Sequence, residues 1–518
     1  MSQPTASEPG ERAAPRDGGG NDGDGRDPGA VYRERRERFA AARAAAARRS
    51  RHLSWARLAV ALAALFLLLA ILLEAQAPPG WAFAALALAV AAAVGGRVGW
   101  HSRNLLVAAV ALRILGSTVR HEILFRYYSG FGDAVRYYVE GLELANWIRA
   151  LQLNPFTLGY WVSGEKWWGT FFLIKSSGVV LSVIGPSMRG EFLVYSLISF
   201  SGIYAISRAV QRLQPGPRSE AYNFWLWLWP SLWFWPASVG KEALLFLAIG
   251  LTVLGYVGRG EGIGWPTFLA GVGLAFCIRP HVAAVLAFAA AAAHWLGAWQ
   301  RLSPRRLAEA ALAVAVAIYA FDGMRAQFGL GDADLEGMRE FVAFRQGQTE
   351  VGGSEIGAVG LSPTGVAMAL VNVWLRPFPW DAHNLTSAFA AVEMLLVWWL
   401  LWKRRRAVLV ALKAWRRHRL LRFGLPFLVV YSLMIGLTFA NLGILARQRT
   451  PILPFLLLVL LAAPDPAVAQ APVPRPAERP ASPASPPRRT PRPSSADRRG
   501  AAAGTRAVIQ PPERRRRR

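Results

Sequence analysis

Cysteine is nearly absent from this chain, since Cys277 is the only one among 518 residues. A single thiol excludes an intramolecular disulfide and a cysteine-cluster metal site. The patterns G-x-x-x-x-G-K-[ST], G-x-S-x-G and H-E-x-x-H are also missing, so ATP-driven transport and the usual serine and zinc hydrolases lack support. Acidic residues are scarce too, with 32 Asp and Glu against 59 Lys and Arg.

Apolar residues, by contrast, are abundant and lie in long runs. The chain is 53% hydrophobic with 21 Trp, and its mean hydropathy is +0.27. The runs lack the alternation of barrel strands, so they predict an all-α polytopic membrane protein. We expect about 12 transmembrane helices, near 54–74, 80–97, 104–124, 189–208, 223–239, 242–258, 264–279, 281–299, 306–321, 386–403, 424–442 and 450–464.

The net charge of +27 is concentrated in the two tails and in short loops between the apolar runs. That distribution follows the positive-inside rule and favours anionic membrane lipids as the partner of the tails, not nucleic acid. No signal peptide is expected, because a long polar segment precedes the first apolar run. The predicted parts are a disordered basic segment (1–52), a transmembrane domain (53–464) with external loops at 125–188 and 322–385, and a disordered Pro- and Arg-rich tail (465–518).

Orientation follows from the strongest basic segment, "KRRRAVLVALKAWRRHRLLR" at 403–422. It should be cytoplasmic, which also places both termini in the cytoplasm and the protein in the plasma membrane. The same threading puts Lys241 and Glu242, in "SLWFWPASVGKEALLF", at the external boundary. Several arginines then lie outside, against the positive-inside rule, and need another reason to be there.

Asp133 begins a predicted interfacial helix in "GDAVRYYVEGLELANWIRA". Aspartate is a good helix N-cap, which is one interpretation. The other is a carboxylate above the membrane that takes a proton from an acceptor hydroxyl. The sequence leaves both interpretations open.

A set of basic residues recurs at the external span ends, and it predicts a site for a lipid phosphate. Arginine forks match phosphate oxygens and lysine adds a point charge. The alternative is ordinary snorkelling to headgroups. Glu242 is expected to be the ion-pair partner of a neighbouring basic residue and is also a candidate substrate contact. The predicted phosphate-binding set is Lys241, Arg279, Arg376, Arg447 and Arg449.

Other polar residues of the external loops are candidate substrate contacts. His281 is either a ligand or proton shuttle, or a hydrogen-bonded boundary histidine. Ser354 and Glu355 follow two glycines in "EVGGSE", where a ligand can approach the backbone closely. Trp380 and Asp381 pair an aromatic ring with a carboxylate, as carbohydrate sites do. No metal ligand set is assigned, and a divalent cation is left open as a cofactor.

These motifs together resemble the GT-C superfamily of membrane glycosyltransferases, over roughly residues 100–465. "GDAVRYY", with Asp133 and Tyr137, is similar to the acidic motif of that family's first external loop, and "ARQRTPILPFL" to its basic motif before a late span. Family members usually carry two adjacent acids, whereas here Ala134 follows Asp133. The resemblance implies a catalytic Asp133, a donor phosphate on the basic set, and a substrate contact at Tyr137.

Three functions from two classes are compatible with this pattern. The resemblance implies an envelope glycosyltransferase that takes a sugar from a polyprenyl-phosphate-linked donor to a glycan, lipid or protein acceptor at the outer face. A polysaccharide polymerase, which joins polyprenyl-pyrophosphate-linked repeat units, would share these marks. A transporter or flippase for lipid-linked glycans is the alternative of another class. The gathering of polar residues on one face, without clear mid-span charges, favours an enzyme.

Overall fold

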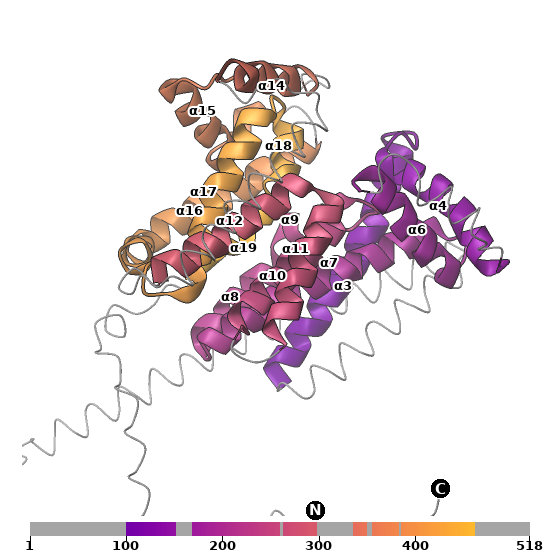
Figure 1. Ribbon diagram of the computed structural model, residues 1–518, viewed down its shortest axis with the longest axis horizontal. Coiled ribbons are helices and arrows are strands. Elements are labelled where there is room, and N and C mark those ends of the chain that lie inside the picture. Colours follow the sequence, from indigo (N-terminus) through magenta and orange to yellow (C-terminus); the bar gives the residue numbers. More distant parts are fainter. Residues whose placement is uncertain are drawn as a thin grey trace, which may run out of the picture. The chain divides into compact units, whose positions relative to one another are not determined.

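The computed structural model describes residues 100–151, 168–259, 263–297, 335–349, 355–382 and 385–461. All lie in one compact unit, Met1–Ala469, and the second unit, Gln470–Arg518, lies outside the described residues. In these ranges the regular structure is helical, with an isolated β-bridge between Glu355 and Asn441, which confirms the all-α class for them. The helices (Figure 1) are α3 (Trp100–Arg126), α4 (Asp133–Arg149), α6 (Thr170–Ile184), α7 (Met188–Leu213), α8 (Pro217–Leu228), α9 (Pro230–Phe234), α10 (Lys241–Val257), α11 (Gly264–Ile278), α12 (Pro280–Gly297), α14 (Leu335–Gly347), α15 (Pro363–Trp374), η1 (Pro379–Asp381), α16 (Leu385–Ala414), α17 (Arg419–Thr438), α18 (Leu442–Gln448), η2 (Thr450–Ile452) and α19 (Leu453–Leu461).

Within the described ranges, three helical segments are long and apolar enough to cross a membrane. They are Met188–Leu213, Arg419–Thr438 and Leu442–Leu461, close to the roughly 20 residues that a span needs. Four shorter apolar helices accompany them, Thr170–Ile184, Gly264–Ile278, Pro280–Leu296 and Pro363–Trp374. By length and composition these are the helices of a membrane protein. The total of about 12 spans is not confirmed. The helices at the spans predicted near 104–124, 242–258 and 386–403 (α3, α10 and α16) are not among these candidates, and the spans expected at 54–74, 80–97 and 306–321, like both basic tails, lie outside the described residues.

The span predicted at 223–239 is wrong as a single helix. Helix α8 ends at Leu228 and α9 ends at Phe234, and the chain then continues without a helix to Lys241. Proline causes both interruptions: Pro230 holds Trp229 in an extended conformation, and Pro236 has no N–H for the carbonyl of Leu232. The buried guanidinium of Arg113 donates a hydrogen bond to that carbonyl instead.

The region 322–385, predicted as a polar external loop, also contains helices. α14 and α15 lie within it, and both pack against α17. The amide nitrogen of Gln346 donates to the carbonyls of Val359 (2.9 Å) and Leu437 (2.7 Å). The segment is therefore held against the helical core by buried hydrogen bonds.

Helix α10 packs between α7 and α11, and small residues let the backbones come close (Figure 1). A Cβ added at Gly202 would lie 2.0 Å from the carbonyl oxygen of Phe246, and one at Gly250 would lie 2.2 Å from that of Gly202. On the other side, a Cβ at Gly271 would lie 2.4 Å from the amide nitrogen of Thr252. Such contacts between small residues are typical of membrane helix pairs. They fix α10, and with it the position of its first residues.

Helices α4 and α6 form a second packed pair, within the predicted external loop 125–188. A Cβ at Gly141 would lie 2.5 Å from the Ser177 hydroxyl, so the two helices touch at this point. The hydroxyl of Ser177 in turn donates to the carboxylate of Glu191 on α7. These contacts hold α4 in place, so that Asp133, its first residue, is fixed as well.

Candidate functional site

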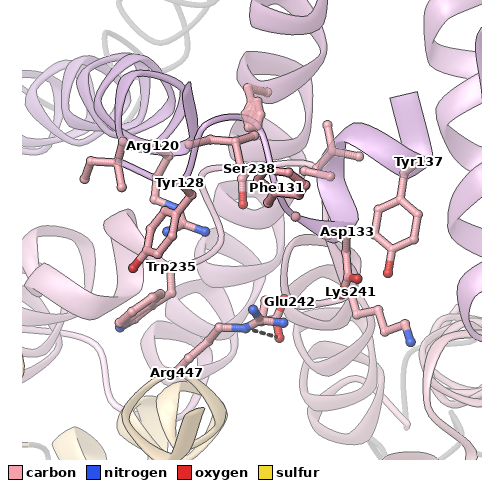
Figure 2. Close-up of a pocket in the computed structure, with 17 residues that line it drawn as sticks. Arg120, Tyr128, Phe131, Asp133, Tyr137, Trp235, Ser238, Lys241, Glu242 and Arg447 are labelled. Atoms are coloured by element: carbon pink, nitrogen blue, oxygen red, sulfur yellow. Dashed lines mark hydrogen bonds and ion pairs between the residues drawn. The ribbon is translucent and has the colours of Figure 1, made fainter. Parts of the chain in front are cut away.

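A polar pocket lies where the start of α4 meets the start of α10 (Figure 2). It encloses about 230 Å³, somewhat less than the roughly 300–1,000 Å³ of small-molecule sites, so it suits a head group and not a whole lipid-linked saccharide. Its walls come from α3, α4, α7, α9–α10 and α18. The lining residues are Arg120, Ile123, Leu124, Tyr128, Phe131, Gly132, Asp133, Ala134, Tyr137, Phe192, Trp235, Ser238, Val239, Gly240, Lys241, Glu242 and Arg447.

Asp133 lies at the rim of this pocket. A turn after α3, with Ser129 and Gly130 at positive φ (48° and 77°), brings the chain round into α4. Gly132 is the N-cap of α4 and Asp133 is its first residue, so the N-cap interpretation of Asp133 is wrong. Its exposed carboxylate makes no hydrogen bond or ion pair with any described residue. The carboxylate is therefore available to a ligand.

Tyr137 lies one helical turn after Asp133, so the two side chains share a face of α4. The ring is buried, and the hydroxyl faces the same pocket. Burial, and then the negative charge of Asp133, raise the pKa of Tyr137 to about 12. The hydroxyl therefore keeps its proton near neutral pH and can donate a hydrogen bond to a ligand.

Glu242 is the central carboxylate of the site. It is 5% exposed, and its Oε1 accepts hydrogen bonds from Arg279 (2.9 Å) and from Arg447 (3.0 Å). Arg279 can reach it because Pro280 ends α11 and keeps Arg279 extended. One oxygen thus joins α10, the α11–α12 junction and α18. The prediction that Glu242 pairs with neighbouring basic residues is confirmed.

Arg447 and Lys241 bring positive charge to the pocket from opposite ends of the sequence. Arg447 lies in the last turn of α18, whose start is capped by the side chain of Asn441. A cation is favourable at that end of a helix. Figure 2 shows Lys241 beside Asp133 and Tyr137, with Arg447 bonded to Glu242. The ammonium of Lys241 makes no hydrogen bond or ion pair with the part of the chain that the structure describes.

Three arginines of the predicted phosphate-binding set do not line the pocket: Arg279 stands behind Glu242, and Arg376 and Arg449 lie elsewhere. Arg376 binds the carboxylate of Asp381 with two hydrogen bonds (2.9 and 2.8 Å). Arg449 is 2% exposed; it donates to the Arg376 carbonyl at 2.6 Å and lies 3.9 Å from Glu393. Arg376, Arg449 and Asp381 therefore belong to a separate cluster, in which each guanidinium has a carboxylate beside it.

The remaining predicted contacts are scattered. His281 is the second residue of α12, partly buried and outside the pocket lining. Glu355 is exposed, and its backbone forms the bridge to Asn441. Trp380 is 74% exposed and stacks on Phe378 with ring centroids 4.9 Å apart. Ser354 lies outside the described residues.

Sequence reasoning missed the other wall of the pocket. Arg120 lies in the span predicted at 104–124, and its guanidinium is stacked over Phe234 (5.3 Å) and Trp235 (5.4 Å). Figure 2 shows Arg120 with Tyr128 and Trp235 across the pocket from Lys241. An arginine inside an apolar run was the available signal, because charges in such runs are costly and mark functional sites.

Metal binding has little local support. Nowhere in the described ranges do three His, Cys, Asp or Glu side chains gather as a metal site would require. Of the two carboxylates that line the pocket, Glu242 has one oxygen engaged by two arginines, and Asp133 has no partner among the residues that the structure describes. These two residues are the ones that could contact a divalent cation brought in with a phosphate.

Comparison with protein families, with curated proteins and with solved structures finds no match to this chain. The function is therefore argued from the site itself. The pocket holds a carboxylate without a partner among the described residues, a protonated phenol and several cations, next to apolar helices. That combination can bind a phosphate, accept a proton from a hydroxyl, and stabilise negative charge on a leaving oxygen.

Proposed function

We propose that this protein is a membrane glycosyltransferase for envelope polysaccharide synthesis. It transfers a sugar from a polyprenyl-phosphate-linked donor to a glycan, lipid or protein acceptor. The observation that carries the proposal is the pocket in which Asp133, without a partner among the described residues, faces Lys241 and the Glu242–Arg447 pair. The apolar helices around it supply a surface for the donor's isoprenoid chain.

The reaction needs one proton acceptor and a site for the leaving phosphate. The acceptor hydroxyl oxygen attacks the anomeric carbon of the donor sugar, and the bond from that carbon to the phosphate oxygen breaks. The bonding electron pair stays on the phosphate oxygen, and the hydroxyl proton passes to Asp133. Lys241 and Arg447 stabilise the new phosphate charge, while the Tyr137 hydroxyl donates a hydrogen bond to the bound substrate.

The reaction takes place at the outer face of the plasma membrane in this proposal, with both termini in the cytoplasm. Its support is the basic stretch of α16 from Lys403 to Arg406, in the second half of that helix, which is exposed and belongs on the cytoplasmic side by the positive-inside rule. The pocket residues lie at the opposite ends of the predicted spans.

Asp133→Asn tests the proposal. The amide cannot take the hydroxyl proton, so we expect transfer to fall at least about 100-fold. Cells lacking the gene are complemented with the wild type or with the variant, and their lipid-linked glycans are measured by mass spectrometry. The Asp133→Asn cells should accumulate the polyprenyl-linked donor as the deletion does.

Glu140→Gln on the same helix is the matched control. Glu140 is an exposed partner of Arg136 and lies outside the pocket lining, so its variant should restore the wild-type lipid pool. Both variants must be present in the membrane in wild-type amounts. A normal lipid pool in Asp133→Asn cells would remove Asp133 from the mechanism, and an unchanged pool in the deletion would contradict the transferase itself.

A second candidate function is a polysaccharide polymerase. It would use the same pocket on pyrophosphate-linked repeat units, and the excess of positive over negative side chains at the pocket favours it. In the same assay, the deletion would then accumulate single repeat units and lose long chains.

A further inference from the structure

The charges at the pocket do not balance. Two carboxylates, Asp133 and Glu242, face it. Three cations line it as well, and Arg279 stands behind Glu242 as a fourth. The pocket with its ion pairs therefore carries an excess of two positive charges.

Neither Arg120 nor Lys241 forms a hydrogen bond or an ion pair with a described residue. Arg120 has its guanidinium over two aromatic rings, and its Nε is buried without a hydrogen-bond acceptor among the described residues. The Lys241 ammonium is likewise unbonded within the described part of the chain. Holding like charges together in a partly buried site is costly unless an anion joins them.

These two cations lie at separate places around the pocket. Figure 2 shows Arg120 on one side, next to Tyr128 and Trp235, and Lys241 on the other side, next to Asp133. Arg447 lies between them, at Glu242. Cations spread in this way around one pocket can contact two neighbouring phosphates.

We propose that the donor bound here is linked through a diphosphate, and that Arg120 selects for its second phosphate. This inference rests on the proposed transfer reaction and changes its donor from a monophosphate to a diphosphate, the linkage that the polymerase alternative also uses. A sugar–diphosphate–isoprenoid carries two negative charges, which match the excess of two, whereas a sugar–monophosphate–isoprenoid carries one.

The charge of the pocket and the charge of the bound diphosphate also match after the transfer step. When the bond from the anomeric carbon to the phosphate oxygen breaks, its electron pair stays on that oxygen and the isoprenoid diphosphate leaves with three negative charges. The acceptor proton neutralises Asp133, so the excess of positive charge at the pocket rises to three at the same step. With a monophosphate donor, one positive charge would remain unmatched before and after transfer.

The test compares two probes that differ by one phosphate, farnesyl diphosphate and farnesyl monophosphate. Binding to the purified full-length chain in detergent micelles is measured from the rise of its thermal unfolding midpoint with probe concentration. The wild type should bind the diphosphate about tenfold more tightly, the factor expected for one additional charged contact. Arg120→Gln should remove that preference, and Arg120→Lys should keep part of it.

Arg126→Gln is the matched control, since Arg126 lies further along α3 with its side chain 78% exposed and outside the pocket lining. It should keep the full preference. Equal affinity of the wild type for both probes, or an equal loss of both in Arg120→Gln, would overturn the diphosphate assignment and leave the transferase standing. Binding of neither probe would also overturn it, while the glycan measurement on Asp133→Asn would still decide the transferase independently.

Discussion

The same dipeptide, Arg-Pro, occurs at two helix ends of this protein with opposite results. Arg279 precedes Pro280, and its side chain reaches Glu242 on another helix, beside the pocket. Arg376 precedes Pro377, and its side chain binds Asp381, five residues further along the chain. Both arginines have the same sequence signature, and only the first belongs to the candidate site.

The two clusters differ in the number of cations that each carboxylate pairs with. Asp381 offers both of its oxygens to one guanidinium, so the Arg376 pair is complete without a ligand. Glu242 offers a single oxygen to Arg279 and Arg447, and Lys241 beside it makes no hydrogen bond or ion pair with a described residue. A buried cluster with fewer carboxylates than cations can bind an anion, whereas a cluster with equal numbers of both is already neutral and stabilises the fold.

Glu242→Gln should produce the largest loss of stability. It leaves Arg279 and Arg447 without a carboxylate, and removing one partner of a buried pair costs about 3–5 kcal/mol. We expect about 3 kcal/mol, because Arg447 is 38% exposed and water compensates part of its charge. The measurement is the thermal unfolding midpoint in detergent micelles. Added diphosphate should recover part of the loss, and a midpoint equal to that of the wild type would contradict the central role of Glu242.

Asp381→Asn should have a smaller effect on stability and none on the pocket. It removes charged hydrogen bonds worth about 2 kcal/mol. Because the Arg376 side chain is 25% exposed, water solvates part of its charge and reduces the loss of stability. The same unfolding measurement applies, together with the farnesyl diphosphate titration. Lost diphosphate binding in a folded Asp381→Asn protein would show that the two clusters are not separate.

Glu140→Gln should have the smallest effect. The Arg136–Glu140 pair lies on the exposed face of α4, and exposed ion pairs contribute little to stability. The unfolding midpoint should stay at the wild-type value in the same micelles. A clear fall would mean that this face of α4 is covered in the folded protein, and it would disqualify Glu140→Gln as a control.

Much of the pocket could be predicted from the sequence because membrane threading brings span ends to one face. Asp133, Tyr137, Lys241, Glu242 and Arg447 were all predicted as site residues, and the structure brings them to one pocket. Their roles in transfer stay predictions. The position of each residue relative to the apolar runs was sufficient to bring Asp133, Lys241, Glu242 and Arg447 to one face, whereas Tyr137 was predicted from the resemblance alone.

Other features depended on side-chain directions that a sequence does not contain. Arg449 turns toward Glu393, 56 residues earlier in the chain, and so leaves the pocket to Arg447. Arg120 was hidden inside an apolar run. The break between α8 and α9 had a visible cause in Pro230, but the hydropathy of the surrounding residues outweighed it.

The most direct test compares Lys241→Gln with Arg376→Gln in cells that lack the wild-type gene. Both substitutions remove one positive charge from a residue predicted to bind phosphate, and lipid-linked glycans are measured by mass spectrometry. Lys241→Gln should accumulate the polyprenyl-linked donor as the deletion does, while Arg376→Gln, if present in the membrane in wild-type amounts, should restore the normal pool. A normal pool with Lys241→Gln, or an accumulation confined to Arg376→Gln, would contradict the assignment of the pocket.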